Sequence, residues 1–142
     1  MLADQLKIVQ ADAFTFYLKA HFYHWNIEGP NFPQYHEFLN DLYNDVWESV
    51  DTCAELIRTL NVYAPGTLSR FKALTTIEES ESIPDAMTMM KNLLEENNML
   101  RASLLKAYSM ADKDGEVGIA NFLQDRIQQH ENHGWMLQSI TK

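Results

Sequence analysis

Histidine, asparagine and acidic residues recur in one stretch of the chain at spacings that suit metal coordination. His24 precedes His36 by twelve residues, and Asn40 follows His36 by four. Asp51 and Glu55 form a second pair, again four residues apart. Residues four apart lie on the same face of a helix, so each pair presents two ligand groups side by side. Imidazole and carboxylate together, with coordination positions left open, are the ligand set expected for oxidisable Fe(II).

The two pairs cannot serve one metal ion if they lie on the same helix. His36 and Asp51 are fifteen residues apart, which is about 60° around a helix and about 22 Å along it. One interpretation is that the pairs are unrelated surface features. In the other, a second copy of the helix lies antiparallel across a two-fold axis. The histidines of one chain then meet Asp51 and Glu55 of its mate, which gives two identical sites.

Four long helices are predicted to position these residues. Gly29 and Pro30 break the first helix just after His24, because Gly tolerates unusual backbone angles and Pro cannot continue a helix. Asn31 is the expected N-cap of the next helix, so His24 and His36 are expected to lie on either side of a short turn. Apolar residues at three- and four-residue spacing place the helices at about 4–26, 31–60, 82–110 and 116–140.

The second and third helices are separated by a long connection, residues 61–81, with a short helix expected at 68–74. A connection of this length is unusual within a compact domain and indicates a crossover between parallel helices. Ser82 is the expected cap of the third helix, with Asp85 at the capping-box position. The pattern therefore predicts an all-α fold, a ferritin-like four-helix bundle, as a single domain over residues 1–142.

Composition narrows the function classes. The chain has 142 residues, 46% of them hydrophobic, and a formal net charge of −9. This charge should repel nucleic acid phosphates, and no basic tail offsets it, so we expect no DNA binding. No apolar run approaches the roughly 18 residues of a membrane span, and we expect neither a membrane partner nor a secretory signal. Cys53 is the single cysteine, which favours a reducing, cytoplasmic location.

The stretch HWNIEGPNFPQYHEFLNDLYNDVWESVDTCAEL resembles the signature of the Dps proteins, the mini-ferritins, and HENHGWML resembles the last helix of that family. The resemblance implies an inter-subunit ferroxidase site, with His24, His36, Asp51 and Glu55 as catalytic residues and metal ligands and Asn40 as a further ligand. It implies a homo-oligomer, a dodecamer built from two-fold dimers, with a hollow acidic interior. It also implies Fe(II) oxidation by hydrogen peroxide and storage of the ferric iron, which protects against oxidative damage.

The chain departs from the family pattern at three points. Asn40 stands where the family usually carries aspartate, so a ligand charge is lost; Asp41 is adjacent but points about 100° away. Leu56 replaces a common arginine, and the basic tail that lets several members bind DNA is missing. Asn40 favours an alternative function: a shell of the same fold with weakened or lost ferroxidase activity, acting as a structural protein or a metal buffer.

Other residues of suggestive type receive simpler interpretations. His130 and His133 do not match the H-E-x-x-H zinc pattern, and we assign them no metal role. His21 is interpreted as an interface residue, and Cys53 as structural. The methionines of the third helix are interpreted as core and interface residues. By the resemblance, Glu116 and Asp125 line a three-fold pore for cation entry.

Overall fold

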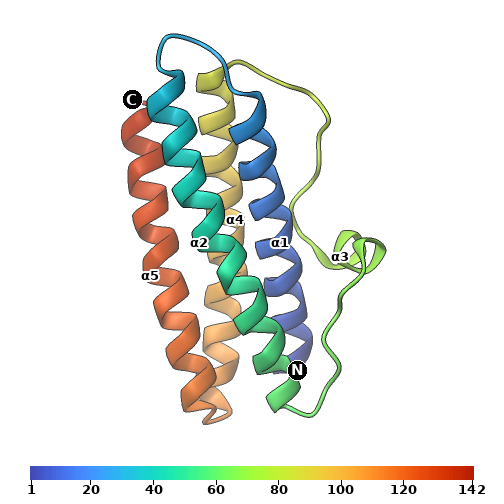
Figure 1. The fold of residues 1–142 in the computed structure, drawn as a ribbon. Helices are drawn as coiled ribbons and strands as arrows, with labels where there is room; N and C mark the ends of the chain where they lie inside the picture. The colour runs from blue at the N-terminus through green and yellow to red at the C-terminus, as the bar shows by residue number, and fades with distance from the viewer.

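The protein consists of five helices and no strands. The computed structural model describes all 142 residues. The four long helices form a bundle, and α3 lies outside it within the connection from α2 to α4 (Figure 1). The prediction of an all-α four-helix bundle with a short helix in its crossover is confirmed. The helices are α1 (Leu2–Asn26), α2 (Phe32–Thr59), α3 (Leu68–Leu74), α4 (Ala86–Lys113) and α5 (Val117–Ile140).

The bundle is built from two antiparallel hairpins. One hairpin is α1 with α2 and the other is α4 with α5, and contacts of α1 with α4 and of α2 with α5 close the ring. Helices α2 and α4 run in the same direction (Figure 1), which the long crossover makes possible. They occupy opposite corners of the bundle, since no contact joins them directly. One side of α2 is therefore left facing outward.

The core is a single cluster of apolar side chains contributed by all four long helices. Its residues follow the three- and four-residue spacing expected of amphipathic helices. Fully buried members include Leu6, Phe16, Leu39, Leu93 and Leu123. Cys53 also belongs to the core, where burial raises the pKa of its thiol to about 12. A buried thiol of this kind is unreactive, in agreement with its structural interpretation.

A buried carboxylate fastens the crossover to the bundle. Asp12, on α1, is fully buried and accepts four hydrogen bonds. Three come from the residues that follow α3: the Thr75 hydroxyl at 2.7 Å, and the Thr76 backbone N–H at 2.6 Å and hydroxyl at 2.9 Å. The fourth comes from the Ser103 hydroxyl on α4, at 2.6 Å. Hydrogen bonding of this completeness makes a buried charge tolerable without a cation beside it.

The helix ends differ from the predictions at a few positions. The prediction that Ser82 caps the third long helix was wrong, because α4 begins at Ala86 and Asp85 is its N-cap. The Asp85 side chain accepts a hydrogen bond from the Thr88 N–H at 2.8 Å, which a carboxylate at this position can do as well as a hydroxyl. Asn31 is the N-cap of α2, but its side chain makes no capping hydrogen bond.

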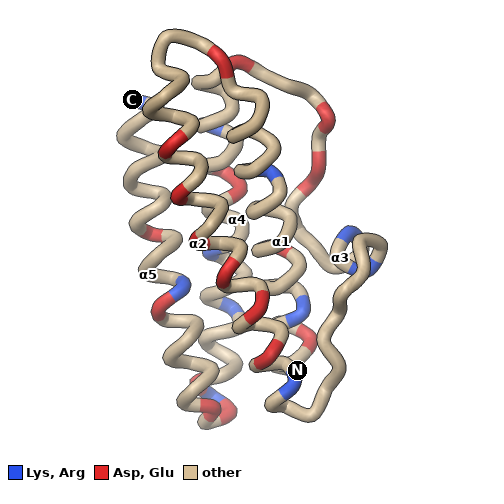
Figure 2. Tube along the Cα trace, viewed as in Figure 1, with Lys and Arg blue, Asp and Glu red and all other residues tan.

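Acidic residues dominate the charged surface. Figure 2 shows Asp and Glu along α2 and on the part of the crossover between α3 and α4, whereas α3 itself carries basic residues. On α2 the exposed acids are Glu37, Asp41, Glu48, Asp51 and Glu55. None of the five helices is long and apolar enough to cross a membrane.

Candidate metal centre

His24 and His36 form a reciprocal pair at one end of the α1–α2 hairpin. The His24 Nδ1 lies 2.8 Å from the backbone oxygen of His36, and the His36 Nδ1 lies 2.8 Å from the backbone oxygen of His24. The two rings stack with centroids 3.7 Å apart and an interplanar angle of 15°. A carbonyl oxygen can only accept, so each Nδ1 must donate its hydrogen. In its neutral form, each imidazole therefore keeps a free lone pair on Nε2, as metal-binding histidines do.

The turn between the helices brings the two histidines together. His24 lies in the last turn of α1, which ends at Asn26, and His36 lies near the start of α2. Gly29 has a φ of +124°, a backbone conformation that residues with a side chain rarely adopt. The Phe32 ring stacks on His36 with centroids 4.8 Å apart. The turn and this ring together fix the orientation of the pair.

Aromatic rings also pack against the histidine pair. Tyr43, one turn beyond Asn40 on α2, meets His24 edge-on at a centroid distance of 5.2 Å. The same tyrosine stacks on His21 at 3.8 Å and 9°. Burial, and then repulsion from His24 whenever that ring is protonated, lowers the pKa of His21 below its ordinary value. His21 is therefore neutral and packed among aromatic rings.

The acidic half of the predicted ligand set lies elsewhere on α2. Asp51 and Glu55 are exposed and have no ion-pair or hydrogen-bond partner within the chain. Asn40 is half-buried near the histidines, with only a long 3.5 Å contact from its amide nitrogen to Asp41. No group of three or more His, Cys, Asp or Glu side chains within one chain could hold a metal ion. Within one subunit the two predicted half-sites, the histidine pair and the acidic pair, therefore lie apart.

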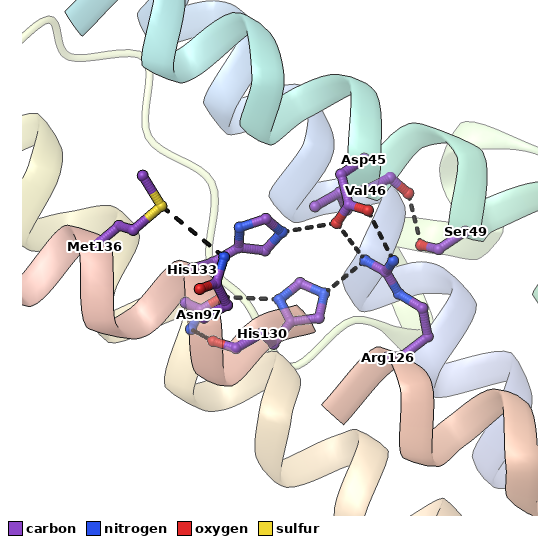
Figure 3. Close-up of polar contacts among 9 residues, drawn as sticks. Asp45, Val46, Ser49, Asn97, Arg126, His130, His133 and Met136 are labelled. Atoms are coloured by element: carbon purple, nitrogen blue, oxygen red, sulfur yellow. Dashed lines mark hydrogen bonds and ion pairs between the residues drawn. The ribbon is translucent and has the colours of Figure 1, made fainter. Parts of the chain in front are cut away.

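A second polar cluster, which the sequence analysis missed, lies inside the bundle (Figure 3). The Arg126 guanidinium on α5 donates to both carboxylate oxygens of Asp45 on α2, at 3.1 and 2.9 Å. His133 Nε2 lies 2.7 Å from the same carboxylate. His130 Nε2 accepts from Arg126 at 3.2 Å, and His130 Nδ1 donates to the Asn97 side-chain oxygen at 2.8 Å. This interior cluster links α2, α4 and α5.

The groups of the interior cluster have strongly shifted pKa values. Burial acts to raise the pKa of the Asp45 carboxyl, but hydrogen bonds from His133 and Arg126 outweigh it and hold that pKa well below its ordinary range. Burial, and then the charge of Arg126, lowers the pKa of His130 well below 6.5. Asp45 is therefore ionised and His130 neutral at pH 7. Arg126 occupies the space between them as an internal cation.

A signal for the interior cluster is present in the sequence. The inward face of α5 follows one stripe of buried residues at alternating spacings of four and three. Arginine and two histidines occupy the middle of this stripe, where apolar residues are the rule. The stripe runs through Ile119, Leu123, Arg126, His130, His133 and Leu137.

Comparison with known proteins gives one consistent result. The ferritin-like domain family matches residues 3–142 of this chain. A low temperature-induced protein of Nostoc is 32% identical over 132 residues, which span 92% of this chain and 74% of that protein. The DNA protection during starvation protein of Helicobacter pylori is 28% identical over 135 residues, which span 94% of each chain.

Solved structures agree with the sequence comparison. The Dps protein of Vibrio cholerae, described as a member of a broad superfamily of ferritin-like diiron-carboxylate proteins, superimposes with a TM-score of 0.95. It is 28% identical, and the match covers 99% of this chain and 89% of that one. Dps of Listeria innocua, solved after soaking in zinc, has a TM-score of 0.93 at 25% identity, covering 98% and 94% of the two chains.

Proposed function

Because this chain belongs to the Dps family of ferritin-like proteins, we propose that it oxidises Fe(II) at a site shared by two subunits and stores the ferric product inside a hollow oligomer. Membership of the family supports the general role of an iron-storing mini-ferritin. The proposal adds the site residues, hydrogen peroxide as the electron acceptor, and a cytoplasmic dodecamer assembled from two-fold dimers.

The reciprocal pairing of His24 and His36 carries this proposal. Both Nδ1 atoms are committed to backbone oxygens at 2.8 Å, so both Nε2 lone pairs are free to bind a cation. Hydrogen bonds of this kind hold a ligand histidine in one tautomer and one orientation. Two neutral nitrogen ligands alone do not neutralise the charge of iron, so carboxylates must complete the site.

Only a second subunit can supply those carboxylates. Asp51 and Glu55 lie on the same helix as His36, but the fifteen residues from His36 to Asp51 span about 22 Å. An antiparallel copy of α2 across a two-fold axis would bring the acidic pair of one chain to the histidines of the other. Because such an interface is isologous, it forms two sites from two chains. The outward side of α2 and its exposed acids suit this arrangement.

The residues of the proposed site then have different roles in the reaction. His24 and His36 hold Fe(II) through nitrogen, and Asp51 and Glu55 of the other subunit supply negative charge that favours the ferric product. Asn40 offers a neutral amide oxygen. Overall, two Fe(II) ions supply the two electrons that each hydrogen peroxide takes up, the O–O bond breaks, and two protons complete two water molecules. Ferric iron then moves to the acidic interior, where it forms a mineral.

Cation entry is assigned to the acids at the start of α5. Glu116 is the N-cap of this helix, and Asp125 is exposed nine residues further along. Nine residues span about 13.5 Å of helix, so the two acids would attract cations along a three-fold channel rather than at one point. Asn121, exposed between them, adds no charge.

Asn40 favours a second candidate function. With an amide where the family usually has a carboxylate, the site has one charge less and binds iron more weakly. The protein would then keep the shell and lose efficient oxidation, and it would act as a structural protein or a metal buffer. The two candidates differ in turnover rather than in shape.

The test is anaerobic loading of the purified assembly with Fe(II), followed by hydrogen peroxide, with ferric absorbance and peroxide loss recorded together. His36→Ala/Asp51→Ala removes one ligand from each half-site. Asp41→Ala, which removes an exposed acid on another side of α2, is the matched control. We expect rapid oxidation in the wild type and in the control, and slow oxidation in the double variant. Equal rates in all three would contradict the assigned site and favour the second candidate.

A further inference from the structure

A run of aromatic rings leads from the histidine pair to the middle of α2. Tyr43 lies edge-on to His24, with centroids 5.2 Å apart. Tyr17, on α1, lies 6.0 Å from Tyr43 and 4.7 Å from Trp47 by centroid distance. Edge atoms of rings at such separations are in or near contact. Electrons move rapidly between aromatic rings this close together, so the run is continuous from the proposed iron site to Trp47.

Trp47 ends the run at a distinctive position. It lies on α2 between His36 and Asp51, about 20° around the helix from His36. Although it is large and apolar, 50% of its surface is exposed in the single chain. If His36 of one subunit faces Glu55 of the other, the two-fold axis passes near the midpoint of these residues, close to Trp47. Each run would then end beside its symmetry copy.

Tyr17 is the member of the run that is equipped for oxidation. Its hydroxyl oxygen lies 2.9 Å from His21 Nδ1. A phenol is a stronger acid than a neutral imidazole N–H, so we assign the hydroxyl as the donor. Oxidised phenols are very strong acids, and they form readily only where a base takes the proton at once. His21 Nδ1, which accepts the hydrogen bond from the Tyr17 hydroxyl, is placed to provide this base.

The need for such a group follows from the iron site. Reduction of hydrogen peroxide to water takes two electrons, whereas one Fe(II) ion supplies one. Asn40 leaves the ligand set one carboxylate short, which favours one firmly held iron per site. The first electron then leaves a hydroxyl radical beside the iron unless a second donor is close.

We propose that Tyr17, with His21 as its proton acceptor, supplies the second electron in peroxide reduction, and that Tyr43 and Trp47 conduct electrons to and from it. This role rests on the proposed ferroxidase function and extends it. It adds to the site a redox relay that lies outside the ligand set.

The steps balance as follows. Fe(II) gives one electron to hydrogen peroxide, which splits into hydroxide and a hydroxyl radical, and Fe(III) remains. Tyr17 gives an electron to the hydroxyl radical, which becomes a second hydroxide, while the phenol proton passes to His21 Nδ1. A later Fe(II) ion returns an electron to the tyrosyl radical, and the proton returns from His21. Two Fe(II) ions are consumed for each peroxide, and no radical leaves the protein.

Freeze-quench electron paramagnetic resonance of the Fe(II)-loaded assembly, mixed with hydrogen peroxide, tests the relay. We expect a tyrosyl signal in the wild type that is lost in Tyr17→Phe, which keeps the ring and removes the hydroxyl. The matched control is Tyr63→Phe, because Tyr63 is 83% exposed and lies outside the run. Spin trapping should show several-fold more hydroxyl radical from Tyr17→Phe than from either other protein. A radical that persists in Tyr17→Phe, or one located on Trp25 instead, would overturn the proposal.

A second arm without iron separates this proposal from the proposed function. Photo-oxidation of the iron-free assembly with a ruthenium tris-bipyridine sensitiser should give a radical at Tyr17, and less of it in His21→Phe, where the base is replaced by a ring. Rapid iron oxidation without any Tyr17 radical would overturn the relay and leave the ferroxidase standing. No iron oxidation in any protein would overturn the ferroxidase, and with it the role in peroxide reduction. A photochemical Tyr17 radical would then support only the conduction path.

Discussion

Arg126 and Asp45 form a two-pronged ion pair inside the bundle, with nitrogen–oxygen distances of 3.1 and 2.9 Å. The pair joins α5 to α2, which otherwise share few contacts. It also places a fixed positive charge where His130 Nε2 and the Asp45 carboxylate both point. Side chains that elsewhere bind metals are occupied here by an arginine, so the bundle interior is a structural centre.

Removal of the arginine should therefore destabilise the bundle. Arg126→Leu leaves the Asp45 carboxylate with only His133 as a partner, and loss of one member of a buried pair costs about 3 kcal/mol. Asp45→Asn/Arg126→Leu removes the charge as well and should recover part of this loss. Thermal unfolding at one fixed subunit concentration measures the effect. A double variant less stable than Arg126→Leu would contradict the charge argument.

The interior cluster also makes stability depend on pH. Burial lowers the pKa of His130, so the folded chain keeps this imidazole neutral while the unfolded chain protonates it below about pH 6.5. The contribution of neutral His130 to the free energy of unfolding is fully present above that pH and is lost as the pH falls below it. Asp45, whose pKa is also lowered, adds a second loss below its ordinary value of 3.8. The midpoint temperature of thermal unfolding should therefore decrease when the pH is lowered from about 7 to 5. The decrease should be smaller in His130→Gln. Equal slopes would show that another group is responsible.

The sequence alone predicted the helices well, because their signals are local. Apolar spacing located the four long helices, and the short helix at residues 68–74 matches α3. The start of α4 was missed, since Ser82 and Asp85 are both good caps and only the path of the crossover decides between them. The His24–His36 turn was also expected from its glycine and proline. Its reciprocal hydrogen bonds were not, because they depend on the angle at which α1 meets α2.

The interior cluster could not be predicted by the same means. A buried arginine is tolerable only with a compensating charge, and that charge, Asp45, lies on α2, far away in the sequence. The aspartate at position 45 gives no sign of its role, because acidic residues also line the exposed side of α2. Pattern analysis identifies which face of a helix is buried, but it does not show which polar groups meet there. The union of the two half-sites stays a prediction for the same reason.

Gly29 should be needed to hold the two histidines in position, although it offers no ligand group to a metal. Its φ of +124° is strained for any residue with a side chain, so Gly29→Ala should cost about 1 to 3 kcal/mol and displace the turn. We expect weaker binding of Co(II), used as a spectroscopic substitute for Fe(II). Gly66→Ala is the matched control, because Gly66 has neither a positive φ nor a close neighbour. Equal Co(II) affinity in both variants would show that the turn does not set the site.

Duplex DNA should not bind to the assembled protein. The net charge of −9 per chain repels phosphates, and salt-dependent phosphate contacts supply most non-specific affinity. A mobility-shift assay at physiological salt should show no retarded band. This should hold up to the protein concentration at which a basic control protein retards all of the DNA. Retention that disappears with added salt would reveal a basic patch formed only in the oligomer.

Asn40→Asp is the substitution that separates the two candidate functions. It restores a carboxylate beside His36 without a change in side-chain size, so each site gains one negative charge for iron. If the wild-type site is already an efficient ferroxidase, the variant should change the rate of peroxide-dependent oxidation little. If the wild type is a weakened shell, Fe(II) affinity and oxidation rate should both rise by about tenfold or more, which corresponds to 1.4 kcal/mol.

Isothermal titration with Fe(II) under anaerobic conditions measures the affinity, and stopped-flow absorbance measures the oxidation rate. Asp41→Asn, which alters the neighbouring exposed acid, controls for general charge effects. A fall in affinity in Asn40→Asp would mean that position 40 does not face the metal, and the ligand set would then consist of His24, His36, Asp51 and Glu55 alone.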